Sequence, residues 1–259
     1  MAEDAKAVVR AQFGASAEAY AKSTVHAKGE SLALLVEFLQ PQPSWHMLDV
    51  GTGAGHTAIR FAPRVKTVVA TDLTEAMVEK TAELAAQQNV SNIMTKVADA
   101  ENLPFDDATF DLVTCRLALH HFPYPHRALH EFARVLKTPG VLGFTDNVTV
   151  DDWDAAKYYN DFEKLRDPSH QNVVSMPRLC QMIEASGFQI RYTKVFAKEF
   201  EFHDWTNRQH VQPQIKTCLL QMMREIPEAL QPLFKPRWTD STLFFSLREA
   251  VIVAFKRDS

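Results

Sequence analysis

The sequence predicts an α/β fold in which helices cover both faces of a doubly wound, mostly parallel sheet. Between residues 46 and 145, short apolar segments alternate with segments of helical periodicity, a pattern typical of such a sheet. A loop with glycine at every second position follows the first apolar segment and precedes a helical one. Such a loop brings bare backbone N–H groups and a helix N-terminus close to a ligand, so we expect a binding site there.

The expected strands and helices follow one another in a regular order up to Asn147, after which the rhythm changes. The predicted strands are 46–50, 66–71, 93–98, 110–115, 141–145, 188–196 and 247–256. The predicted helices are 3–13, 25–39, 54–62, 74–88, 125–136, 151–166 and 176–186, with a connector over 15–23. Residues 204–236 separate the last two strands without a core of their own, so we expect a helical lid there.

Composition excludes several classes of protein. The net charge of −4 gives no indication of a nucleic-acid-binding surface. The acidic start lacks the apolar segment of a secretory signal, and no apolar run approaches the roughly 18 residues of a membrane span. Cys115, Cys180 and Cys218 are far apart and form no C-x-x-C pair, which indicates neither a zinc site nor a disulfide framework. We therefore expect a cytoplasmic protein; the sequence does not indicate its oligomeric state.

The glycine loop, Gly51-Thr52-Gly53-Ala54-Gly55, departs from the dinucleotide-binding fingerprint. That fingerprint is G-x-G-x-x-G/A, and its last small residue allows close packing of helix on strand. Here the last position is His56, and an acid, Asp49, precedes the first glycine. A glycine loop alone also serves plain tight turns. The pattern thus favours a nucleotide ligand other than NAD.

Acidic residues follow the second and third predicted strands. Asp72 can accept hydrogen bonds from ribose hydroxyls, although Asp72 or Thr74 could instead cap helix 74–88. Asp99 can accept from an adenine amine while Ala100 leaves room for the ring, although a plain polar turn is also possible. Together with the loop, these acids indicate an adenosine-containing ligand.

Several motifs in order carry a resemblance to a known family. They are Asp49-Val50-Gly51-Thr52-Gly53-Ala54-Gly55, Val69-Ala70-Thr71-Asp72, Ala98-Asp99-Ala100-Glu101-Asn102-Leu103-Pro104-Phe105 and Phe110-Asp111-Leu112-Val113. This set resembles the class I S-adenosylmethionine-dependent methyltransferases. The segments Leu119-His120-His121-Phe122 and Glu131-Phe132-Ala133-Arg134-Val135-Leu136-Lys137 resemble the branch that includes the ubiquinone/menaquinone C-methyltransferases (methyltransferase type 11). The similarity covers roughly residues 10–147.

The resemblance implies a Rossmann-like methyltransferase fold with a seven-stranded sheet in one domain, residues 1–259. Its implied parts are an N-terminal helical cap (1–43), a cofactor-binding core (44–147), a segment that completes the fold (148–203), a helical lid inserted between the last two strands (204–240) and the final strand (241–259).

The resemblance also implies S-adenosylmethionine as cofactor, with defined residues around it. Asp49 would orient the methionine amino group, Asp72 would bind the ribose, and Arg116 would lie beside the methionine moiety. An N-terminal aromatic residue often closes over the cofactor in these relatives, which indicates Tyr20, with Phe13 as packing. The remaining implied cofactor-binding residues are Gly51, Thr52, Gly53 and Gly55 in the loop, and Leu73, Met77, Asp99, Ala100 and Glu101 around adenine.

Methyl transfer requires a nucleophile in line with the methyl group, and a dedicated base is optional. His121 is the first candidate for a general base because it follows the fourth strand, where the methyl group would lie. Tyr124, Asp146 and Tyr159 are weaker candidates. His126 and His130 are four residues apart on one helix and could bind a metal, but a solvated helix face is the favoured interpretation, and no metal is expected.

We therefore expect an enzyme that transfers a methyl group to carbon or oxygen of a small-molecule acceptor, which we expect to be apolar or ring-containing. The aromatic and methionine residues of 153–162 and 205–238 could line an apolar pocket or form the core between lid and sheet. One alternative is an S-adenosylmethionine-binding enzyme of the same fold that catalyses another reaction. His56 disfavours an NAD-dependent oxidoreductase, and the acids Asp49, Asp72 and Asp99 disfavour a scaffold without cofactor.

Overall fold

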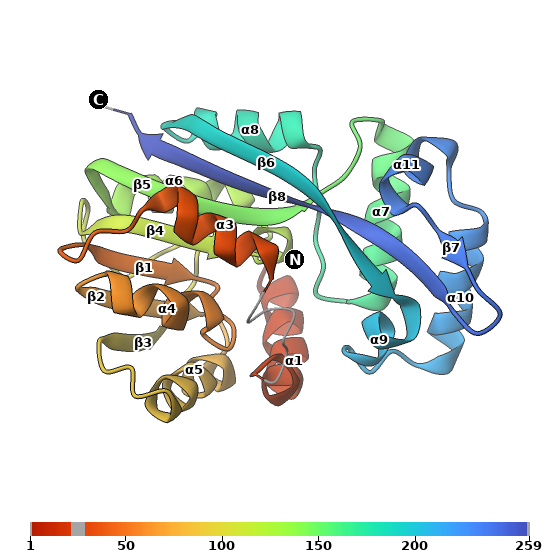
Figure 1. Ribbon diagram of the computed structural model, residues 1–259, viewed down its shortest axis with the longest axis horizontal. Helices are drawn as coiled ribbons and strands as arrows, with labels where there is room; N and C mark the ends of the chain where they lie inside the picture. The colour runs from red at the N-terminus through yellow and green to blue at the C-terminus, as the bar shows by residue number, and fades with distance from the viewer. Residues whose placement is uncertain (1, 22–28, 258–259) are drawn as a thin grey trace.

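The computed structural model describes residues 2–21 and 29–257, without the side chains of residues 15, 19 and 20. Its centre is an eight-stranded sheet of order β3-β2-β1-β4-β5-β8-β6, with β7 paired to β8 (Figure 1). Strands β1 to β5 pair in parallel, and β8 pairs antiparallel with β5, β6 and β7. The strands are β1 (His46–Val50), β2 (Thr67–Asp72), β3 (Ile93–Val97), β4 (Phe110–Arg116), β5 (Leu136–Val148), β6 (Phe188–Glu201), β7 (Arg237–Trp238) and β8 (Leu243–Lys256).

This topology confirms the predicted α/β fold with a mostly parallel sheet. The additional strand, β7, has two residues, which is too short for any periodicity to reveal. Strands β5, β6 and β8 are longer than predicted, since β6 continues to Glu201 and β8 begins at Leu243. The pairing of β6 with β8 forms a long ribbon that carries the segment between them beyond the rest of the sheet (Figure 1).

Helices cover both faces of the sheet because successive strand residues point to opposite faces. In β1, Met47 packs in a buried cluster with Leu35 of α3 and Phe61 of α4. Its neighbour Leu48 packs in a second cluster with Phe132 of α6 and others from α8. The helices of these layers are α3 (Glu30–Leu39), α4 (His56–Phe61), α5 (Glu75–Gln87), α6 (Pro125–Val135) and α8 (Met176–Ala185).

A third apolar cluster joins α7 (Trp153–Arg166) to the segment between β6 and β8. This segment holds α9 (Phe202–Asn207), α10 (Pro213–Arg224), a short 3-10 turn (Glu228–Leu230) and α11 (Gln231–Phe234). The cluster includes the fully buried side chains of Tyr159, Phe162, Trp205 and Phe234. Most aromatic residues of these stretches therefore form core rather than an apolar pocket.

The N-terminus differs from the prediction. Helix α1 (Ala2–Ala21) runs through Gly14 instead of ending there, and it packs on α5. A glycine inside a helix costs only about 0.5–1 kcal/mol relative to alanine, and alanines on both sides of Gly14 favour the helix. The predicted connector is thus helical up to Ala21, and its remaining residues lie outside the described part. None of the described helices is long and apolar enough to cross a membrane.

Candidate active site

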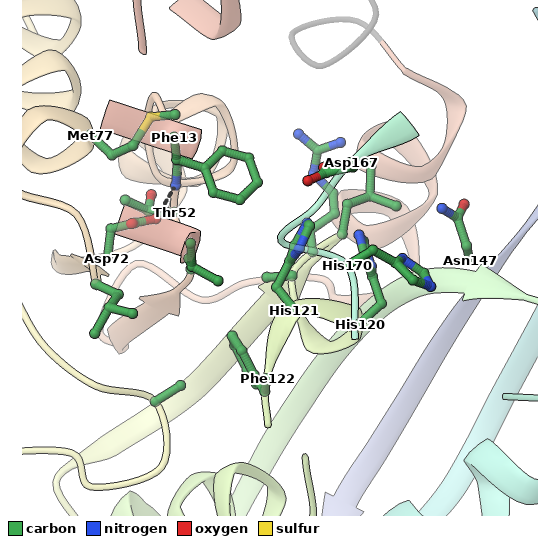
Figure 2. Close-up of a pocket in the computed structure, with 18 of the residues that line it drawn as sticks. Phe13, Thr52, Asp72, Met77, His120, His121, Phe122, Asn147, Asp167 and His170 are labelled. Atoms are coloured by element: carbon green, nitrogen blue, oxygen red, sulfur yellow. Dashed lines mark hydrogen bonds between the residues drawn. The ribbon is translucent and has the colours of Figure 1, made fainter. Parts of the chain in front are cut away.

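A pocket opens at the carboxyl ends of the parallel strands, where ligands bind in open α/β sheets. One half is lined by the glycine loop and by residues that follow β2 and β3. The other half is lined by residues that follow β4 and by side chains of α7, β6, β8 and α9. In Figure 2, Thr52, Asp72 and Met77 lie on one side, and His120, His170 and Asn147 lie on the other.

The backbone conformation of the loop explains why glycine occupies three of its positions. Gly51, Gly53 and Gly55 have φ angles of 64°, 55° and 86°, in the left-handed region that favours glycine. A Cβ atom on Gly55 would lie 2.6 Å from Cγ2 of the buried Thr81, whereas a Cβ on Gly53 would meet nothing within 4 Å. Gly53 lines the pocket, as do Gly51 and Thr52, while Gly55 does not. Gly55 instead precedes helix α4.

Asp72 lies at the end of β2 and joins this strand to the loop. Its carboxylate accepts hydrogen bonds from the backbone N–H groups of Gly53 (2.9 Å) and Thr74 (3.0 Å). Burial raises the pKa of this carboxyl group, and the two backbone hydrogen bonds oppose the rise. Each oxygen keeps a lone pair, and Asp72 lines the pocket. The carboxylate can therefore bind a ligand while it fixes the loop.

Asp49 lies behind the loop and does not line the pocket. Its oxygens accept hydrogen bonds of 2.6 Å from the hydroxyl groups of Thr52 and Thr114. Burial raises its pKa to about 6, against these hydrogen bonds and the positive charge of Arg116. Arg116 does line the pocket, and its Nε atom donates to Thr57 Oγ1. Any effect of Asp49 on a ligand must pass through its neighbours in this arrangement.

The acids after β3 are held by a residue that the sequence did not indicate. The ammonium group of Lys6 on α1 lies 2.6 Å from Oδ2 of Asp99 and 2.7 Å from Oε2 of Glu101. Burial lowers the pKa of Lys6, but these hydrogen bonds outweigh it and raise the pKa overall. Val9 and Phe13 of the same helix also line the pocket. Helix α1 therefore closes the predicted adenine end, which Ala100, Leu73 and Met77 line as well.

His120, after β4, forms a dyad with Asp146 of β5. Its Nδ1 atom lies 2.5 Å from Asp146 Oδ1, and its backbone N–H donates to Oδ2 of the same carboxylate. Burial lowers the pKa of His120, but the charge and hydrogen bond of Asp146 outweigh it and raise the pKa above its ordinary value. Nε2 is then the ring nitrogen that can contact a ligand. This is the arrangement of a general base oriented by a carboxylate.

His121, the first candidate from the sequence, lies beside this dyad and lines the same pocket. Its Nδ1 atom is 3.1 Å from the hydroxyl of Ser169, which donates its proton to Asp167. Because the Ser169 hydroxyl donates its proton to Asp167, it can only accept a hydrogen bond from His121. Nδ1 of His121 therefore carries the ring hydrogen, and Nε2 is unprotonated. Burial and the charge of His120 lower the pKa of His121 to about 4. His121 is thus a weaker base than His120.

The remaining candidates lie elsewhere. Tyr159 is fully buried in the third apolar cluster and does not line the pocket. Tyr124 is exposed, and only its backbone N–H contacts the site, by donating to Glu101. His126 and His130 are exposed on α6, as a solvated helix face requires. The side chain of Tyr20 lies outside the described residues.

Sequence reasoning missed the charged residues of the second half of the pocket. They come from α7, β6, β8 and the end of α9, far apart in the sequence, and each looks like one member of a solvated face. They are Glu163, Arg166, Asp167, Lys198, Arg208 and Glu249. One available signal was Lys198, which shares a face of β6 with Phe196 and Phe200, but this pattern does not distinguish a pocket from solvent.

Comparisons with known proteins agree with this geometry. Residues 48–144 match the family described as a methyltransferase domain. The chain is 34% identical over 196 residues to the uncharacterized methyltransferase YcgJ of Bacillus subtilis, which covers 76% of this chain and 78% of the relative. The crystal structure of YcgJ has a TM-score of 0.85 at 28% identity and covers 88% of this chain and 99% of that one.

Two further relatives extend the comparison. The crystal structure of protein BH2331 from Bacillus halodurans has a TM-score of 0.85 at 34% identity and covers 89% of this chain and all (100%) of that one. The ubiquinone/menaquinone biosynthesis C-methyltransferase UbiE of a Ruegeria species is 34% identical over 155 residues, which cover 58% of this chain and 57% of the relative.

The fold, the pocket and these similarities together define an enzyme of the methyltransferase class. The chain belongs to the class I S-adenosylmethionine-dependent methyltransferases. Membership of this class implies S-adenosylmethionine as the methyl donor.

Proposed function

We propose that this enzyme transfers a methyl group from S-adenosylmethionine to a hydroxyl oxygen of a small molecule. The observation that carries the proposal is the His120–Asp146 dyad, whose His120 lines the same pocket as the glycine loop and Asp72. A carboxylate-oriented imidazole with a raised pKa removes a proton from a hydroxyl group efficiently near neutral pH. Transfer to carbon is the alternative at this site.

The residues of the first half of the pocket fit the donor. Gly53 presents backbone without a side chain to open space, and the partly buried carboxylate of Asp72 lies next to it. Asp99 and the small Ala100 lie further along the same wall, under helix α1. The donor would supply an electrophilic methyl group on a sulfonium. Asp72 would hold the ribose hydroxyls, and the Asp99 region would hold adenine.

The chain's own contribution to the chemistry lies opposite. His120 would accept the acceptor's proton at Nε2, and Asp146 would stabilise the resulting imidazolium. His121 would remain neutral beside it, with its ring held by Ser169 and against Phe13. Helix α1 and the segment after β6 would exclude water from the pocket, which strengthens electrostatic interactions there.

The test is to incubate the protein with S-adenosylmethionine labelled on the methyl group and a panel of hydroxylated and carbon acceptors. We expect S-adenosylhomocysteine in equal amount to an O-methylated product. Thermal shifts should show stabilisation by S-adenosylhomocysteine and none by NAD, since only a true ligand stabilises by mass action. Stabilisation without any S-adenosylhomocysteine formation would instead favour an enzyme of this fold that catalyses another reaction.

A further inference from the structure

Two buried carboxylates line the half of the pocket beyond the histidines. Glu163 of α7 is 4% exposed and Glu249 of β8 is 2% exposed. Glu249 lies directly opposite Asn147 in the β5–β8 pairing, so the two side chains share a face of the sheet, and Asn147 also lines the pocket. The carboxylates therefore come from different elements and converge on one cavity.

Each carboxylate is only partly satisfied. Glu163 Oε2 is 3.7 Å from Arg166 Nη1, and Glu249 Oε2 is 3.6 Å from Lys198 Nζ, distances longer than a hydrogen bond. The Oε1 atom of both residues is buried and accepts no hydrogen bond from any residue that the structure describes. Because buried polar groups are nearly always hydrogen-bonded, these oxygens indicate donors on a ligand.

The charges around these oxygens disfavour a ligand with a net charge. The carboxylates around these oxygens are Glu163, Asp167 and Glu249, and the cations around them are Arg116, Arg166, Lys198 and Arg208, all of which line the pocket. An ammonium group bound to either glutamate would lie close to one of the cations, and a carboxylate or phosphate bound to a cation would lie close to one of the acids. Neither class of ion can pair here without repulsion from a neighbour.

Hydroxyl groups fit this arrangement because each can donate one hydrogen bond and accept two. Adjacent hydroxyls can donate to a glutamate and accept from the cation beside it. The half-buried ring of Phe200 lines the same half of the pocket and offers apolar surface to the C–H face of a ring, whereas Trp205 is only 1% exposed and belongs to the wall itself. Trp205 itself is fixed by the guanidinium of Arg166, which lies 4.3 Å from its ring centroid.

We infer that the acceptor is a neutral molecule with several hydroxyl groups, held by Glu163 with Arg166 on one wall and by Glu249 with Lys198 on the other. This inference rests on the proposed methyl transfer and names the substrate class for it. It replaces the apolar acceptor expected from the sequence, since the apolar residues of α7 and of the segment after β6 are mostly core.

The test uses ligand-observed NMR on the enzyme loaded with S-adenosylhomocysteine. The probes are myo-inositol, methyl glucoside and catechol as neutral polyols, against cyclohexylammonium, cyclohexanecarboxylate and 1-naphthol. We expect saturation transfer to at least one polyol and to none of the other three. Glu163→Gln and Glu249→Gln should each weaken binding of that polyol about tenfold or more, because each loses a charged acceptor. Both variants should keep the wild-type affinity for S-adenosylhomocysteine, which shows that they are folded.

The matched control is Glu184→Gln, at an exposed glutamate of α8 outside the pocket, which should leave polyol binding unchanged. Binding of no polyol, or polyol binding that survives both glutamate variants, would overturn the inference. An assay of labelled methyl transfer to the same six compounds distinguishes a failure of this inference from a failure of the proposed function. Glutamate-dependent polyol binding without any transfer would keep the inference and refute methyl transfer, whereas transfer to 1-naphthol alone would do the reverse.

Discussion

Nδ1 of His120 and Oδ1 of Asp146 lie 2.5 Å apart, and this contact joins the loop after β4, where His120 lines the pocket, to β5. The same carboxylate also accepts the backbone N–H groups of His120 and Asn147. The imidazole is therefore oriented by a group that is itself fixed by the sheet. Its position across the pocket from Thr52 and Asp72 sets the base opposite the proposed cofactor half of the site (Figure 2).

Replacing Asp146 by asparagine tests the dyad. The variant keeps the size of the side chain but loses the charge that raises the pKa of His120, so we expect kcat to fall by about 10²- to 10⁴-fold while affinity for S-adenosylhomocysteine is kept. His126→Gln, on the exposed face of α6, is the matched control and should be silent. A kcat within twofold of wild type would exclude the dyad from the reaction.

The pH dependence of kcat/KM distinguishes the two histidines. A general base acts when it is neutral, so the rate should rise with pH through the pKa of the base. If His120 is the base, the rate should rise above pH 6.5, because its pKa is raised above the ordinary histidine pKa of 6.5. If His121 is the base, the rate should rise at about pH 4, because its pKa is lowered to about 4. We expect the wild-type rise above pH 6.5, and its displacement to lower pH in Asp146→Asn. A rise near pH 4 in the wild type would assign the base to His121.

Asp72→Ala should weaken S-adenosylhomocysteine binding by about 1.5–3 kcal/mol, or roughly 10- to 150-fold, through loss of hydrogen bonds to a charged acceptor. Asp72→Asn keeps one acceptor oxygen and should lose less. Calorimetric titration measures both affinities. Because the carboxylate also holds Gly53 and Thr74, circular dichroism should accompany the titration. An affinity equal to wild type in a folded Asp72→Ala protein would remove Asp72 from the cofactor site.

Lys6→Met should make helix α1 open more often over the cofactor half. The lysine joins the helix to Asp99 and Glu101, and Asp99 is about a third exposed, so solvent screens part of the ion pair. We expect association and dissociation of S-adenosylhomocysteine both to accelerate, by about three- to tenfold, in stopped-flow fluorescence. Arg10→Met on the exposed side of the same helix controls for general loss of charge. Identical rates in the lysine variant and the wild type would show that α1 does not gate the site.

Two glycine substitutions separate folding from binding. Gly55→Ala places a methyl group 2.6 Å from Thr81 in a left-handed conformation, so strain and overpacking together should cost about 2–5 kcal/mol of unfolding free energy. Gly53→Ala meets open space and should cost only about 1–2 kcal/mol, while its methyl group enters the pocket and lowers cofactor affinity. Urea unfolding and calorimetry measure the two effects. Equal loss of stability in both variants would contradict this division.

The sequence predicted the parallel half of the fold and most of the residues that line the proposed cofactor half of the pocket, because both depend on local pattern. Asp72 and Asp99 follow their strands directly, and parallel strands place their carboxyl ends at one edge of the sheet. Helix α1 was mispredicted because Gly14 is a weak signal that its alanine neighbours outweigh.

The second half of the pocket depends on tertiary contacts that no local pattern reports. His120 and His121 are neighbours in sequence, and only the fold gives one of them Asp146 and the other Ser169. Glu163 and Glu249 meet at the pocket because the β6–β8 ribbon and α7 pack around a common apolar cluster. Judged from the sequence alone, these two glutamates are typical of solvent-exposed faces of a helix or a strand.

A crystal structure with S-adenosylhomocysteine would show where the cofactor lies relative to His120. We expect adenine beside Asp99 and Ala100, ribose hydroxyls on Asp72, and the sulfur atom facing His120 across the pocket. A ligand whose sulfur faces away from His120, or whose ribose makes no contact with Asp72, would contradict this placement.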